Sequence, residues 1–287
     1  MVSHFNNYSI TMKYDKINAS LITALENGEN VWRKTWQAVK DYGMPHNLNS
    51  GKNYSGSNVL ILGMQDVPCQ AWVTFKGARS LGGNVRKGAK GTTVFFWQFP
   101  EITDKKTGEK KTVPFLKTYV VFNAMRDCEG LEDKLKDKAP MGESNPSEYL
   151  QDYLKREDIA LSHGGNSAYY APMQDAITMP HETAFENSDY YNSVLAHEII
   201  HSTGHSKRLN RLEKQAAFGS GSYAFEELVA EIGACYLCAI IGIEPDFDQS
   251  ASYLKGWAKK LKENQNWFTS AGGKAQKALA FIEAGKE

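Results

Sequence analysis

Residues 194–201 read Val-Leu-Ala-His-Glu-Ile-Ile-His, and this stretch decides the fold of the second half of the chain. It matches the pattern H-E-x-x-H, in which two histidines one helical turn apart bind the same zinc ion. The aliphatic neighbours indicate a buried helix, where polar side chains need a partner or a function. We therefore expect His197 and His201 to bind a metal and Glu198 to act as the proton acceptor. The alternative, two surface histidines beside a solvated acid, fits these neighbours less well.

A catalytic zinc ion takes three protein ligands and keeps a fourth position open. His205 lies one turn beyond His201, but it follows Gly204, which we expect to end the helix. The longer spacing H-E-x-x-H-x-x-G-x-x-H would place a third histidine at position 207. That class of site is excluded because the residue there is Lys207.

Residues 225–234, Phe-Glu-Glu-Leu-Val-Ala-Glu-Ile-Gly-Ala, offer a carboxylate ligand instead. In the gluzincin pattern one acid binds the zinc ion and a second acid, four residues later, holds a zinc-bound histidine. Glu227 and Glu231 have this spacing on one face of a predicted helix, so we assign them these two roles. We expect Glu226 to point outward. The alternative is that all three are acids on the helix surface near its N-terminus.

This ligand set predicts hydrolysis. Two neutral imidazoles and one carboxylate leave a net charge of about +1, which lowers the pKa of zinc-bound water to about 7. Glu198 would take a proton from that water and pass it to the leaving amine. Tyr223, His205 and Arg208 are candidates for stabilising the oxyanion. The ligand types also suit manganese or another divalent ion.

The two halves of the chain carry opposite charges although the total is zero. Residues 1–126 hold 17 Lys and Arg against 8 Asp and Glu, a net charge of +9, and residues 127–287 carry −9. A basic half is typical of proteins that bind a polyanion. The alternative is that the charge of each half serves only to keep that half soluble. We predict one domain over 1–126, a linker rich in charge, Pro and Gly over 127–147, and a second domain over 148–287.

Residues 72–91 hold five cations and five glycines, with Trp72 and Phe75 at the start. Glycines let a backbone approach a phosphate chain, cations neutralise it, and aromatic rings stack on unpaired bases. The segment therefore favours single-stranded nucleic acid, and the alternative is a glycine-rich loop with both aromatic rings in the core. Similar pairs of basic and aromatic residues occur upstream. The predicted contacts are Trp32, Trp36, Lys52, Tyr54, Trp72, Phe75, Lys76, Arg79, Arg86, Lys87 and Lys90.

Hydrophobic periodicity predicts an α+β fold. In the basic half we expect a helix over 14–25, strands over 92–99 and 113–122, and a charged hairpin segment over 103–111. In the second half we expect strands over 168–171 and 176–179 and four helices. These helices cover 148–155, the span from a Ser188-Asp189 cap to His201, 223–241 with Ser222 as its cap, and 274–284.

Composition excludes several classes of protein. Hydrophobic residues make up 41% and charged residues 23% of the chain, which excludes wholesale disorder. No run approaches the 18 or more apolar residues of a membrane span, and no secretory signal opens the sequence. With only four cysteines, of which Cys235 and Cys238 read as small buried hydrophobes, we expect a cytoplasmic protein.

Taken together, these features resemble plasmid antirestriction proteins of the ArdC type. Such proteins join an N-terminal single-stranded-DNA-binding domain to a C-terminal zincin-like domain related to SprT-type proteases. The resemblance implies a small α/β domain, a mainly helical metallopeptidase domain with a short sheet, and residence on a mobile element or phage. It also implies that residues 176–179 or their partner strand at 169–170 line the substrate cleft. The matching segments are 53–60, 72–91, 122–123, 169–170, 175–180, 196–209 and 224–233.

We therefore predict a zinc metallopeptidase that binds single-stranded DNA and hydrolyses peptide bonds of proteins associated with it. The alternative is a protection protein that coats single-stranded DNA without proteolysis, in which the metal site is structural. The two hypotheses differ in whether Glu198 is needed.

Overall fold

A four-stranded sheet organises the basic half of the computed structural model. Its strand order is β1-β2-β7-β4, with β1 parallel to β2 and the other neighbours antiparallel. The bounds are β1 (His46–Asn47), β2 (Ala71–Thr74), β4 (Thr92–Gln98) and β7 (Phe115–Asn123). The structure describes residues 18–19, 21–98, 100–103, 110–112, 115–135, 145–212, 221–245 and 251–285.

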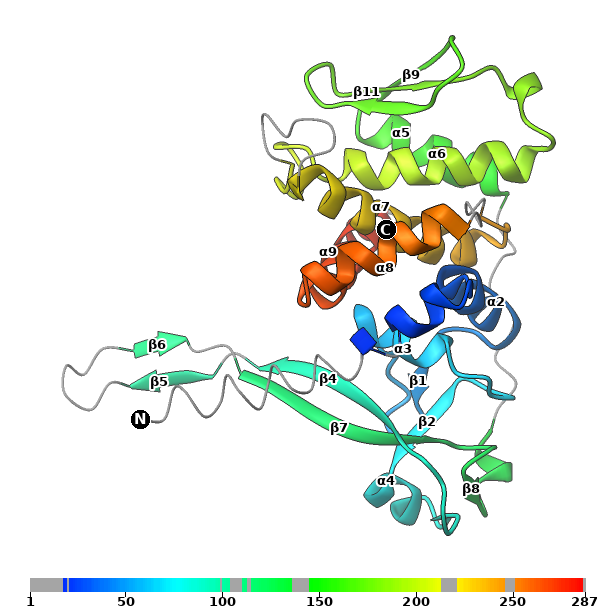
Figure 1. The fold of residues 1–287 in the computed structure, drawn as a ribbon, viewed down its shortest axis with the longest axis vertical. Helices are drawn as coiled ribbons and strands as arrows, with labels where there is room; N and C mark the ends of the chain where they lie inside the picture. The colour runs from blue at the N-terminus through cyan, green and yellow to red at the C-terminus, as the bar shows by residue number, and fades with distance from the viewer. Residues whose placement is uncertain are drawn as a thin grey trace.

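The strands β4 and β7 extend sideways from the body of the molecule as a long arm (Figure 1). They pair from Thr92↔Val121 to Gln98↔Phe115, and a second ladder pairs Glu101 with Thr112 farther out. The strands of that ladder are β5 (Glu101–Thr103) and β6 (Lys110–Thr112). The predicted strands are confirmed over these bounds, while residues 104–109 of the predicted hairpin lie outside the described residues.

Helices pack on both faces of the four-stranded sheet. Neighbouring residues of β2 point to opposite faces, so each face of the strand contacts a different helix. Trp72 packs with Leu62 of α3, whereas Ala71 and Val73 pack with Ala78 of α4. The helices of this half include α2 (Val31–Tyr42), α3 (Ser57–Gly63) and α4 (Phe75–Ser80). The sequence did not predict α2, which begins where the Asn30 side chain accepts a hydrogen bond from the Arg33 N–H.

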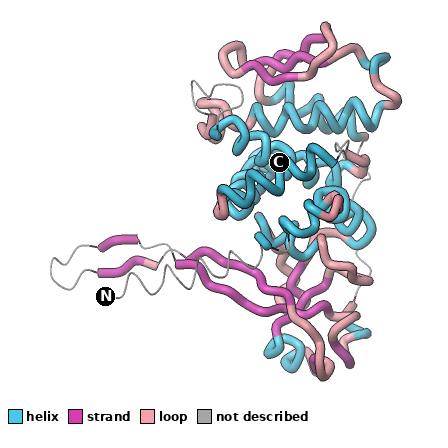
Figure 2. Tube along the Cα trace, in the orientation of Figure 1, coloured by secondary structure: helices cyan, strands magenta, loops and turns pink. Residues whose placement is uncertain are grey.

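The second half places a small sheet above a stack of helices (Figures 1 and 2). Its strand order is β10-β11-β9, so β10 lies at an edge. The strands are β9 (Ala160–His163), β10 (Tyr169–Ala171) and β11 (Ala176–Met179). The helices are α5 (Pro146–Arg156), α6 (Ser188–Ser202), α7 (Gly221–Ile241), α8 (Ala251–Glu263) and α9 (Trp267–Ala284). None of these described helices meets the length and apolarity needed to cross a bilayer.

Several predicted element boundaries need correction. The cap of α6 is Asn187, whose side chain accepts from the Tyr190 N–H at 2.8 Å, rather than Ser188. Ser222 lies inside α7, which already begins at Gly221. Helix α9 begins seven residues earlier than predicted, and α8 and β9 were not predicted. Cys235 and Cys238 are buried, as expected.

The largest hydrophobic cluster extends across both halves of the chain, and two smaller clusters lie within the basic half. The core cluster joins residues of α2 and α3 to residues of α7 and α9. The Trp36 indole N–H donates to the Ile243 carbonyl at 2.7 Å, and the Tyr236 hydroxyl donates to the Gly56 carbonyl at 3.0 Å. Helices α2 and α3 of the basic half therefore pack directly on α7 and α9, and the domain boundaries at residues 126 and 148 stay a prediction.

The contact between α3 and α9 predicts a large difference between two adjacent glycines. A Cβ on Gly272 would lie 2.7 Å from the Ser57 backbone nitrogen, whereas a Cβ on Gly273 meets nothing within 4 Å. We expect Gly272→Ala to lower the free energy of unfolding by about 1–3 kcal/mol. Gly273→Ala should raise it by about 0.5–1 kcal/mol through helix propensity. Urea denaturation of the two variants measures this difference, and equal midpoints would contradict the close packing of α3 on α9.

Candidate metal centre

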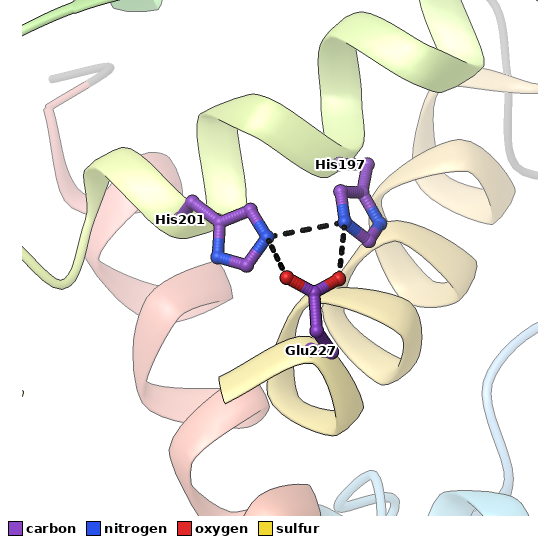
Figure 3. Close-up of side chains that lie close together, drawn as sticks. All are labelled: His197, His201 and Glu227. Carbon is purple, nitrogen blue, oxygen red and sulfur yellow. Dashed lines mark hydrogen bonds and ion pairs between the residues drawn. The ribbon is translucent and has the colours of Figure 1, made fainter. Parts of the chain in front are cut away.

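Three side chains that can bind a metal converge from α6 and α7 (Figure 3). Nε2 of His201 lies 3.1 Å from Nε2 of His197. The two nitrogens face different oxygens of Glu227, because Nε2 of His197 lies 3.5 Å from Oε2 and Nε2 of His201 lies 3.5 Å from Oε1. Ligand atoms about 2.05 Å from a tetrahedral zinc ion are about 3.3 Å apart, and each of these separations is close to that value. One ligand atom from each of the three residues lies within 4.8 Å of the other two, which is compact enough for one ion. The structure therefore brings together the three residues predicted as metal ligands.

Close packing of α7 on α6 makes this convergence possible. Leu195, Ile199 and Ile200 of α6 are fully buried and fix the helix, so that His197 and His201 face the other way into a cavity. A Cβ on Gly233 would lie 2.8 Å from a methyl carbon of Ile200. Any larger residue at position 233 would push α7 away from α6 and draw Glu227 away from the histidines.

Acidic side chains shift the pKa values of the groups in this site. Burial raises the pKa of Glu227, but the hydrogen bond to His197 and the nearby positive charges lower it to about 2. Burial lowers the pKa of His197, but the hydrogen bond to Glu227 and the charges of Glu231 and Glu198 raise it to about 9. Carboxylates therefore dominate the local field, which is the field that a cation requires.

Glu226 holds His201, which corrects the expectation that it points outward. Only 12% of its side chain is exposed, and its Oε1 lies 3.3 Å from Nδ1 of His201. Arg211 donates to the same carboxylate from Nε and Nη2 at 2.8–3.1 Å. Burial raises the pKa of Glu226, but the bonds and charges of His201 and Arg211 lower it. Sequence reasoning missed Arg211, which also donates to Thr203 Oγ1 at 2.7 Å.

Glu231, predicted to hold a histidine, influences His197 through its charge and makes its hydrogen bond to a different residue. Its Oε1 accepts a hydrogen bond from the Tyr253 hydroxyl at 2.5 Å, on a helix that the sequence did not predict. Burial raises the pKa of Glu231 despite the charge of His197 and the bond from Tyr253. Glu231 therefore acts on His197 through charge, whereas Glu226 lies within 3.3 Å of the His201 ring on the side away from Glu227.

Glu198 lies in the same cavity, which has a volume of about 650 Å³. Its side chain is buried, and Oε2 accepts the Tyr170 N–H at 2.8 Å. Tyr169 and Tyr170 of β10 also line the cavity. Of the two strands expected to form the cleft, the edge strand β10 is the one that lines it.

A buried polar cluster holds β10 in this position. The Tyr170 hydroxyl donates to Oδ1 of Asp175 at 2.7 Å, and the buried Arg208 side chain donates to the same carboxylate. His205 lies 3.6 Å from Asp175. Arg208 is thus engaged by Asp175, whereas Nδ1 of His205 accepts the Lys207 backbone N–H at 3.2 Å. Among the three oxyanion candidates, Tyr223 is the one that lines the cavity.

The predicted nucleic-acid contacts divide into two groups. Trp36, Tyr54 and Trp72 are buried in the core, which corrects their assignment as stacking residues because no ring face is available. The Phe75 ring is exposed, with the Arg79 guanidinium 4.7 Å from its centroid. The Trp32 side chain lies outside what the structure describes. The remaining predicted contacts are exposed cations, namely Lys52, Lys76, Arg86, Lys87 and Lys90.

Two family models match the chain. The N-terminal domain of the anti-restriction factor ArdC matches residues 12–122, and a zincin-like metallopeptidase matches residues 148–274. The metal-free crystal structure of ArdC from plasmid R388 is 37% identical, covers 94% of this chain and 96% of that chain, and has a TM-score of 0.76. Its Mn(II)-bound form is 36% identical, covers 94% of this chain and 97% of that chain, and has the same TM-score.

Longer proteins also contain a similar region. A DNA primase TraC of Escherichia coli is 33% identical over 94% of this chain, and a second TraC is 31% identical over 94%. The chain spans only 20% and 27% of the lengths of these two primases. The uncharacterized protein y4eC of Sinorhizobium fredii is 29% identical, and the match covers 91% of its length.

The Asp175 cluster predicts a pH dependence of stability. Burial raises the pKa of Asp175, but hydrogen bonds from Arg208 and Tyr170 and nearby positive charges lower it below its ordinary value of 3.8. A lowered folded-state pKa stabilises the fold above the ordinary pKa, and this contribution disappears as the pH falls through the folded-state value. Asp175→Asn should therefore flatten the loss of unfolding free energy below about pH 4.

Urea denaturation between about pH 3 and pH 7 measures this slope. Asp152→Asn, on the exposed side of α5, is the matched control and should keep the wild-type slope. Identical slopes for Asp175→Asn and wild type would show that the ion pair with Arg208 does not lower the pKa of Asp175.

Proposed function

The chain belongs to the ArdC family of antirestriction proteins, and we propose that it is a metal-dependent peptidase acting on proteins bound to single-stranded DNA. The observation that carries this proposal is the convergence of His197, His201 and Glu227 in one cavity with Glu198. The zincin-like domain and the geometry of the ligand atoms support it.

The donor set fits a divalent ion, and we propose Zn²⁺. Two imidazoles and a carboxylate suit zinc and also manganese, and the R388 relative has a Mn(II)-bound structure. When bound, the ion would supply Lewis acidity and lower the pKa of a coordinated water. Glu226 would accept the Nδ1–H of His201 and so direct the Nε2 lone pair toward the ion.

The residues around the ligands can perform the proton transfers of peptide hydrolysis. Tyr170 N–H fixes Oε2 of Glu198, so we assign proton acceptance from water to Oε1. Glu198 would then return that proton to the leaving amine. Burial and the charge and hydrogen bond of Glu227 raise the pKa of Tyr223 to about 12, which keeps its hydroxyl protonated. That hydroxyl donates to Glu227 in this structure, and once Glu227 bound an ion the hydroxyl could turn to donate to the carbonyl oxygen as negative charge develops there.

The position of β10 favours an extended peptide as substrate. The strand is at the edge of its sheet and lines the cavity beside Glu198. An extended chain can pair with an edge strand through its backbone, which would place a peptide bond across the cavity.

The exposed cations of the basic half support single-stranded DNA as the second partner. Lys76, Arg79, Arg86, Lys87 and Lys90 lie on or just after α4. Contacts between such cations and phosphates release counterions, so the affinity should fall steeply with salt.

A second candidate function is a non-proteolytic protein that coats single-stranded DNA. It is favoured by the burial of Glu198 and its hydrogen bond to Tyr170, because a carboxylate engaged in this way can serve the fold alone. In that case the metal site would be structural.

Cleavage of a protein bound to oligo(dT) distinguishes the two functions. We expect Glu198→Ala to lower kcat/KM by about 100-fold or more while metal content and oligo(dT) affinity stay unchanged. Glu182→Ala, an exposed acid outside the cavity, is the control and should cleave like wild type. Equal cleavage by Glu198→Ala and wild type would contradict the peptidase.

Charge reversal tests the coating function in the same assays. If antirestriction survives Glu198→Ala but is lost on charge reversal at Lys76, Arg79, Arg86 and Lys87, coating is the function. If both sets of variants lose antirestriction, the tethered peptidase is supported.

A further inference from the structure

A groove of about 290 Å³ lies where the edge strand β4 meets α9, away from the metal cavity. The Phe96 side chain, on β4, forms one wall of the groove. It is 40% exposed, whereas large apolar side chains are more often buried. Phe96 is fixed from behind, because the Asn58 side chain accepts the Phe95 N–H at 2.9 Å and donates to the Phe95 carbonyl at 2.7 Å. These bonds hold the backbone of β4 in place beside the groove.

The groove has the polarity of a site for a nucleobase. Its other walls carry neutral hydrogen-bonding side chains, including Ser55 from the loop before α3 and Thr269 and Gln276 from α9. None of its lining residues is Asp or Glu, whereas the metal cavity holds three glutamates. An aromatic wall with neutral donors and acceptors suits a base and offers no repulsion to its phosphates.

A second ring and a cation continue from the groove along the same face of the sheet. Phe96 pairs with Lys117, and Val94 pairs with Tyr119, so these side chains share one face. The Tyr119 ring meets Phe96 edge to face at 5.4 Å, and Lys117 Nζ lies 5.3 Å from the Tyr119 centroid. Stacking rings beside a cation are the pattern of a single-strand path.

We propose that this groove holds one unpaired base of bound single-stranded DNA, stacked on Phe96, with an adjoining phosphate near Lys117. The proposal rests on the proposed DNA binding and names where a base sits. The face that carries Phe96 and Tyr119 is the α3 face of the sheet, opposite to α4 and its cations. A strand in the groove contacts both halves of the protein, because α9 belongs to the half that holds the metal ligands and packs on α7.

Two open glycines provide a matched test that spares the core. A Cβ on Gly273, in the groove, and a Cβ on Gly256, on α8, each meet nothing within 4 Å. Gly273→Leu adds a side chain at the groove, and Gly256→Leu adds the same side chain elsewhere. Phe96→Ala removes the stacking ring, and Tyr42→Ala removes a ring with a similar exposure of 41% on α2.

The experiment is fluorescence anisotropy of labelled oligo(dT) with the full chain, together with an abasic oligonucleotide of equal length. We expect Gly273→Leu and Phe96→Ala to weaken oligo(dT) binding about 5- to 100-fold, and Gly256→Leu and Tyr42→Ala to bind like wild type. On the abasic strand, which keeps the phosphates, all five proteins should bind alike.

The outcomes separate this inference from the function on which it rests. If wild type binds oligo(dT) and both groove variants bind equally well, the groove is not a base site although DNA binding stands. If the affinity of the groove variants for the abasic strand falls by the same factor as their affinity for oligo(dT), Phe96 does not stack on a base. If wild type binds neither strand, the proposed DNA binding fails and the base site fails with it.

Discussion

The close approach of α7 to α6 is the constraint on which the candidate site depends. Gly233 lies so close to Ile200 that no side chain fits between them. This contact determines the distance between α7 and α6, the helix that carries the two histidines. The apolar contact fixes Glu227 opposite His197 and His201 without contributing any group to the chemistry. The positions of the three side chains therefore depend on packing, because a methyl group added at Gly233 would move α7 and separate Glu227 from the two histidines.

The polar groups around the ligands follow from the same geometry. Three glutamates line the cavity, and positive charge nearby stabilises their carboxylates. Arg211 forms an ion pair with Glu226, and we propose that a bound cation plays this part for Glu227. The buried Asp175–Arg208 pair acts separately by fixing β10, whose Tyr170 N–H holds Glu198. The site therefore has two supports, one that orients His201, a proposed metal ligand, and one that orients Glu198, the proposed proton acceptor.

The spacing of residues along a helix predicts which side chains share a face, but it does not predict how two helices are rotated against each other. His197, Glu198, His201 and Glu227 follow from residues four apart on two helices, but the orientation of Glu226 depends on how α7 is rotated against α6. Arg211 comes from a segment that folds back after α6, and nothing local in the sequence indicates that return.

The same limit applies to the basic half. The pattern of a cation beside a tryptophan is identical for Trp36 in the core and for a ring on the surface, and only tertiary packing separates the two. Phe96 lies in a strand that the sequence predicts, yet its exposure follows from the register of β4 with β7 and from the position of α9. The fold class and several of the helices and strands could be predicted from sequence, although α2, α8 and β9 could not. The faces and partners of side chains depend on contacts between distant segments.

Calorimetric titration of the metal-depleted protein with Zn²⁺ tests the central claim most directly. Wild type should bind one ion per chain, and Glu227→Ala should lose more than about 100-fold in affinity, while Glu182→Ala keeps the wild-type value. Equal affinity in wild type and Glu227→Ala would contradict a site built from α6 and α7.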